Sequence, residues 1–199
     1  MKNNKWSVES FSAEPIHVVL FISRNKDNLS VSDFKERRKS FITHKKIEDL
    51  KEEFEDFVSH GVENEMCRMY YSVNARDPQK IYTQLMHFLF NNPDFNLCSI
   101  APKLAGIAAQ KECRLEKKWM FDFDIKDKDI AKEFISDLYT FGNFPPLTAI
   151  TAYSTPHGYA IVVPHGFDTR PLFEKWTENV TLKRDDLLCV DWKSKKEAL

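Results

Sequence analysis

The sequence predicts an α+β fold in which an antiparallel or mixed sheet is flanked by helices. Short apolar runs rich in β-branched residues alternate irregularly with segments of helical periodicity, as is typical of this class. Two such runs near residue 155 are separated by five turn-forming residues, which indicates a hairpin. The chain has 199 residues, 42% of them hydrophobic, and contains 16 phenylalanines but only five glycines. It is therefore long and apolar enough for one domain with a dense core.

The first half of the chain begins with a short apolar strand. Beyond it, apolar residues recur at helical spacing from Ile47 to Val58. Asp77 and Pro78 are typical of a helix N-cap followed by proline at the first helical position, and Asn91-Asn92-Pro93 ends that pattern. The expected strands cover 16–22 and 68–74, and the expected helices cover 47–61, 77–91 and, as one or two pieces, 97–115.

The second half contains a strand at 118–127 and the hairpin. A helix over 129–139 is expected to stop near Gly142. The hairpin strands are 148–153 and 159–163, a short helix covers 169–177, and the last strand is 186–191.

Composition limits the possible partners and compartments. The formal charge of −1 gives no global basicity for nucleic-acid binding, although basic patches occur at 35–46 and 111–118. Such runs are most often solvated surface. Four scattered cysteines without a C-x-x-C pair indicate neither a zinc ribbon nor a disulfide frame, and they favour a reducing cytoplasm. The polar segment 1–10 and the lack of any run of about 20 apolar residues predict neither export nor membrane insertion.

Asp122 and Asp124 are the most informative pair of residues. They alternate with Phe121, Phe123 and Ile125, so a strand would place both acids on one face and the apolar residues on the other. Two neighbouring carboxylates repel each other and need a cation or hydrogen-bond donors to compensate them, and a divalent metal is the obvious candidate. Oxygen ligands on a strand suit Mg²⁺ or Mn²⁺. The alternative is an edge strand whose acids face water.

Two further polar features follow this strand in the chain. Ser154-Thr155-Pro156-His157-Gly158 is a turn between two strands, and Lys183 to Asp191 is an acidic strand region with Asp186 and Asp191 as candidate metal ligands. In this order, the Asp-x-Asp strand, the Ser and His turn and the later acid resemble the catalytic core of the archaeo-eukaryotic primase and primase-polymerase superfamily. The resemblance covers about residues 66–192 and rests on short motifs.

The resemblance implies one primase-like domain over 1–199, with an RRM-like core at 66–192 and an N-terminal strand and helical extension at 1–65. It also implies a metal-dependent nucleotidyltransferase that acts on nucleotides and on single-stranded or primed nucleic acid, in a phage or other mobile element or beside a replication protein partner. Asp122, Asp124 and either Asp186 or Asp191 would hold the metal, and His157 would join the catalytic set. The position where the family has its phosphate-contacting histidine is Ala160.

Other polar residues are candidates for contacts with nucleotide or template. Lys183 and Arg184 would neutralise phosphate charge, and Ser154 would position phosphates in the turn. Asn74 and Arg76 end a strand and present a polar pair, or form an ordinary strand end. Arg170 contacts a nucleotide, or belongs to a loop in which Asp168 or Thr169 caps the next helix.

The three tryptophans Trp119, Trp176 and Trp192 either stack on bases or belong to the core. Two other functions compete with nucleotidyl transfer. The same fold could bind nucleic acid or a protein without turnover, which the alanine at position 160 favours. A two-metal site also serves nucleases and phosphoesterases.

Overall fold

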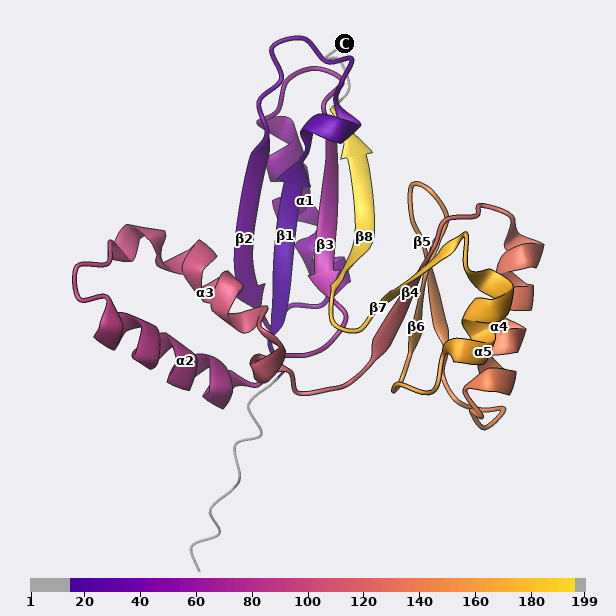
Figure 1. Ribbon diagram of the computed structural model, residues 1–199. Helices are drawn as coiled ribbons and strands as arrows, with labels where there is room; N and C mark the ends of the chain where they lie inside the picture. The colour runs from indigo at the N-terminus through magenta and orange to yellow at the C-terminus, as the bar shows by residue number, and fades with distance from the viewer. Residues whose placement is uncertain (1–14, 196–199) are drawn as a thin grey trace, which may run out of the picture.

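The computed structural model describes residues 15–195 and contains two four-stranded sheets and five α-helices (Figure 1). All strand pairs are antiparallel. The first sheet has the strand order β2-β1-β3-β8 and the second the order β5-β6-β4-β7. The strands are β1 (His17–Ser23), β2 (Arg37–Thr43), β3 (Met66–Ser72), β4 (Trp119–Phe123), β5 (Thr151–Ser154), β6 (Tyr159–Val163), β7 (Val180–Lys183) and β8 (Leu187–Ser194). The helices are α1 (Lys51–Ser59), α2 (Pro78–Asn91), α3 (Ile100–Ala108), α4 (Lys128–Phe141) and α5 (Arg170–Trp176).

Helix α1 covers one face of the first sheet. Its apolar residues Phe54 and Phe57 pack against Phe21 of β1 and Met69 of β3, in one buried cluster. The spacing of three residues between the two phenylalanines places both on the sheet side of the helix. Helix α3 packs on part of the opposite face, because Val18 of β1 and its strand partner Ile42 of β2 lie in one apolar cluster with Ile107 of α3.

Helices α4 and α5 cover one face of the second sheet. Phe121 and Phe123 of β4 are fully buried against Phe134 of α4 and Trp176 of α5. Asp127 caps α4 by accepting hydrogen bonds from the amides of residues 129 and 130. On the other face of this sheet, Met120 and Ala160 are buried in a cluster with Leu188 of β8.

Helices α2 and α3 lie side by side, next to the first sheet and on the side away from the second (Figure 1). Ile81 of α2 and Ile107 of α3 are buried with Ile16 and Val18 at the start of β1. Asp77 caps α2 through the amides of residues 79 and 80, as the Asp-Pro pair predicts. No helix within residues 15–195 is long and apolar enough to cross a membrane.

The α+β class, the antiparallel strands and the hairpin of β5 and β6 are as expected. The structure adds two strands that the sequence analysis did not predict, β2 and β7. The basic stretch 35–46 is thus mostly a strand. The expected division at residue 65 does not follow a boundary between sheets, because β1 and β2 pair in one sheet with β3 and β8. The polar segment 1–10 lies outside the described residues.

Candidate functional site

The face of the first sheet opposite α1 and the face of the second sheet opposite α4 and α5 line a common cleft with a volume of about 500 Å³. The first sheet contributes Leu20, Ile22, Arg68 and Tyr70, and the second contributes Met120, Asp122 and Ala160. Each set has period-two spacing within its strand, because alternate strand residues point to the same face. The cleft therefore follows directly from the strand patterns once both sheets are in place.

Asp122, Asp124 and Asp186 form an acidic wall of the cleft: Asp122 is in β4, Asp124 directly follows β4, and Asp186 lies in the turn between β7 and β8. The predicted alternation in β4 is confirmed: Phe121 and Phe123 are buried against the helices, while Asp122 lines the cleft. Burial, and then the charge of Asp124, raise the pKa of Asp122 above its ordinary value; Asp186 adds to the rise, and Lys183 and His157 oppose it. The acids thus lie close enough to repel one another and are only partly compensated.

The turn between β5 and β6 packs directly on the end of β4. The amide of Gly158 donates to Thr155 Oγ1, and the amide of Thr155 donates to the carbonyl of Gly158. A Cβ at residue 158 would lie 2.0 Å from the carbonyl oxygen of Phe123, so only glycine allows this approach. The close packing brings His157 to the cleft beside the acids.

The same cleft has a basic wall, which we define as Arg24, Lys26 and Arg68: Arg68 is in β3, while Arg24 and Lys26 follow the end of β1. Arg68 is only 7% exposed, and its Nη2 donates to Asp27 Oδ1 at 2.6 Å. Asp27 also accepts from Arg24 Nε at 2.8 Å, so one carboxylate holds both arginines. Arg68 Nη2 lies 3.4 Å from His157 Nε2, while Arg68 Nε is buried without a partner. The basic wall is therefore fixed in place and keeps unused hydrogen-bonding capacity.

The structure brings five of the predicted site residues into this cleft: Asp122, Asp124, His157, Lys183 and Asp186. Of the two candidates for the third acid, only Asp186 lines it; its carboxylate lies 3.4 Å from Lys183 Nζ. Asp191 lies farther along β8 and is not part of the cleft wall. Ser154 lines a second, neighbouring cavity instead.

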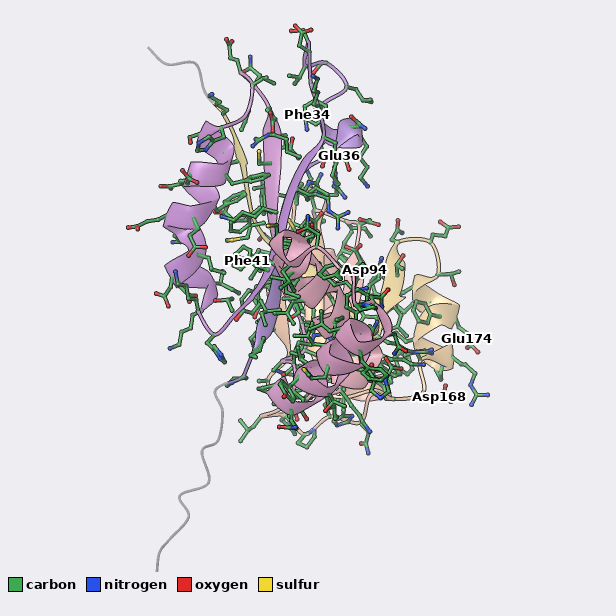
Figure 2. The ribbon with its side chains drawn as sticks, turned by 90° about the vertical axis from the view of Figure 1, so that its left-hand side faces the viewer. Phe34, Glu36, Phe41, Asp94, Asp168 and Glu174 are labelled. Carbon is green, nitrogen blue, oxygen red and sulfur yellow. The ribbon has the colours of Figure 1, made fainter. Side chains whose placement is uncertain are left out.

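The other predicted contact residues lie outside both cavities. Asn74 and Arg76 are 0% and 1% exposed, and both bind Asp185 in the turn between β7 and β8. Their polar groups are used inside the fold, so they are not exposed to a nucleotide. Arg184 stacks on the Trp119 ring at 5.3 Å. Arg170 pairs with Asp168, which lies on the outer surface beside α5 (Figure 2).

The basic wall is the part of the site that the sequence analysis missed. Arg68 interrupts an otherwise apolar strand and shares a face with Tyr70, which was a usable signal. Its partner Asp27 is 41 residues away in the chain, so the pairing itself was not visible.

The acidic wall suits a hard divalent cation that is also bound by substrate phosphates. Within the described part of the chain, no group of three or more His, Cys, Asp or Glu side chains is arranged to hold a metal ion alone. Mg²⁺, however, is commonly bound by one or two carboxylates together with substrate phosphates. The partly compensated pair Asp122 and Asp124 fits this mode, with Asp186 nearby.

Comparisons with family models, with curated proteins and with solved structures returned no match. The functional assignment therefore rests on the geometry and electrostatics of the cleft.

Proposed function

We propose that this protein is a metal-dependent nucleotidyltransferase of primase-like type, acting on nucleotides and single-stranded or primed nucleic acid. One observation carries the proposal: an acidic wall that includes Asp122 of β4 and a basic wall that includes Arg68 of β3 line the same cleft, although β4 and β3 belong to different sheets. A metal-bound triphosphate needs both kinds of group at once, because carboxylates hold the cation and arginine or lysine holds the phosphates.

The acidic wall and the basic wall have different roles in the proposed transfer. Asp122 and Asp124 would hold Mg²⁺ or Mn²⁺, and a bound ion would neutralise phosphate charge and favour ionisation of the attacking hydroxyl. Arg68 and Lys26 would bind phosphate oxygens from the opposite side, with Asp27 keeping Arg68 in place. The hydroxyl oxygen bonds to the α-phosphorus, the bond to the β-phosphate oxygen breaks, pyrophosphate leaves, and the hydroxyl proton passes to water.

His157 and Ala160 modify this scheme. Ala160 pairs with Asp122 across β4 and β6 and lines the cleft, but it has no polar atom to offer a phosphate. His157 lies on the preceding turn, with Nε2 3.4 Å from Arg68 Nη2. We assign to His157 and Arg68 the phosphate contact that the resemblance implies for position 160.

The test is nucleotide incorporation on primed and unprimed single-stranded templates with Mg²⁺ or Mn²⁺. Wild type is compared with Asp122→Asn/Asp124→Asn, for which we expect a loss of at least about a hundredfold. Asp94→Asn/Asp168→Asn is the matched control, because it removes the same charge at two exposed positions away from the cleft (Figure 2). Extension by wild type and control alone supports the proposal.

Two other outcomes would replace it. Shortened strands without extension would identify a nuclease or phosphoesterase using the same acids. No product from any variant, with nucleic acid still bound, would leave a binding module. The missing imidazole at position 160 is the observation that favours this second candidate.

A further inference from the structure

A second cavity, of about 740 Å³, adjoins the cleft and has a different character. The two cavities share Lys26, Arg68 and the turn residues Thr155, Pro156 and His157. None of the three acids of the acidic wall lines the second cavity. It is therefore a continuation of the site away from the proposed metal position.

The second cavity combines flat rings with cations. Trp192 of β8 pairs directly with Arg68 of β3, and residues paired in this way point to the same face of a sheet. Tyr159 lines the same cavity, as does Lys126 just beyond β4. Rings that bases can stack on, beside cations that bind phosphates, are the usual means of holding a single strand.

The charges favour a phosphodiester strand over a free triphosphate. Asp27 is the one carboxylate that lines the second cavity, and it is already bonded to Arg24 and Arg68. A triphosphate normally arrives with its metal and needs free carboxylates, which only the first cavity offers. Backbone phosphates need cations alone. Arg68 stands between the two cavities, with its buried Nε unpartnered.

We infer that the second cavity binds an unpaired nucleotide of a single nucleic-acid strand, with the base on Trp192 and the phosphate on Arg68 and Lys126. The inference deepens the proposed function and rests on it for the choice of nucleic acid as the substrate. A strand with its reacting end at the acids passes the shared residues Arg68 and His157 and places a neighbouring nucleotide in the second cavity.

The experiment is fluorescence anisotropy of a labelled oligothymidylate of about 12 nucleotides, in EDTA so that no catalysis occurs. We expect Trp192→Leu to weaken binding by about fivefold or more, the range for loss of one stacked base. Lys126→Ala should weaken binding to all sequences and lower the slope of log affinity against log salt by about 1. Lys126 is exposed, so this variant is expected to fold even if Trp192→Leu does not.

Two matched controls lie outside both cavities. Phe90→Leu removes an aromatic ring that is 87% exposed on α2, and Lys128→Ala removes an exposed lysine two residues from Lys126. Both should bind as wild type. Wild-type affinity in Lys126→Ala and in folded Trp192→Leu would overturn the inference, as would displacement of the oligonucleotide by thymidine triphosphate at equal concentration.

Failure of this inference is separable from failure of the proposed function. If the variants weaken binding while no protein incorporates nucleotides, the strand site stands and the transferase does not. If wild type incorporates nucleotides but binding ignores Trp192 and Lys126, the transferase stands and the strand site does not.

Discussion

Two buried arginine and aspartate pairs, Arg68 with Asp27 and Arg76 with Asp185, have the same chemistry in different surroundings. Their closest N to O distances are 2.6 Å and 2.9 Å, and in both arginines Nε is buried without a partner. Arg68 lines two cavities. Arg76 lines neither, and Asp185 is further bonded to Asn74.

A buried ion pair is therefore not by itself evidence for a binding site. The ion pair of Arg76 and Asp185 connects the segment after β3 to the turn between β7 and β8. Strand β7 belongs to the second sheet and β8 to the first. That pair holds the connection between the two sheets against the segment that follows β3. Arg68 lines two cavities, so its side chain borders space that a ligand can occupy.

The largest expected effect is the loss of stability on breaking the pair that joins the sheets. Asp185→Ala leaves the charge of Arg76, which is 1% exposed, without its carboxylate, and we expect unfolding to become easier by about 3–5 kcal/mol. Urea denaturation measures this. Asp27→Ala is the matched comparison and should cost less, because its arginines border the cleft. Equal losses would remove the distinction between the pairs.

Arg68→Met should act on binding more than on stability. The variant removes a guanidinium from the shared wall, so we expect oligonucleotide affinity to fall by about 1.5–3 kcal/mol, the usual value for a hydrogen bond to a charged group. Asp27 keeps Arg24 as its partner. Anisotropy in EDTA gives the affinity, and Arg38→Met, at an exposed position on β2, is the control. Unchanged affinity would show that Arg68, like Arg76, has only a structural role.

Asp122→Asn should stabilise the protein while abolishing nucleotide incorporation. Unlike the aspartates of the two pairs, Asp122 is half-buried and has no arginine partner within residues 15–195, and burial followed by the charge of Asp124 raises its pKa. Removal of that charge is expected to add about 0.5–2 kcal/mol to the free energy of unfolding. Denaturation and incorporation are measured on the same preparation. A destabilised variant would show that the acidic wall is already compensated within the fold.

The smallest expected effect is the pH dependence of the stability that Asp122→Asn gains over wild type. Because the folded-state pKa of Asp122 lies above its ordinary 3.8, the unfolded chain loses this proton at lower pH than the folded protein. Wild-type stability therefore falls, relative to Asp122→Asn, as pH rises from about 3.8 to the raised pKa, and the difference is constant above it. Urea midpoints of both proteins between pH 4 and pH 7 test this. A difference that shrinks with rising pH would reverse the sign.

The acidic wall was predictable and the basic wall was not, for physical reasons. Period-two alternation places Asp122 opposite its phenylalanine neighbours whatever the rest of the chain does. Selection of Asp186 over Asp191 needed the register of β8, which shifts opposite Met69 and Tyr70. Strand β2 was missed because Arg37, Arg38 and Lys39 are typical of solvated surface, and only the pairing with β1 makes them a strand.

Asp185 and Asp186 are adjacent in the chain, but Asp185 is bonded inside the fold while Asp186 lines the cleft. The contacts of Asp185 therefore predict which further positions tolerate mutation poorly. Asp185 is bonded to Asn74, and Asn74 exchanges two hydrogen bonds with the backbone of Lys118, the residue just before β4. Asp185, the neighbour of Asp186, is thus connected through the buried Asn74 to the residue that precedes β4. Asn74 should accept few replacements in a deep mutational scan for activity, as few as the acids themselves, although it never meets the reacting groups.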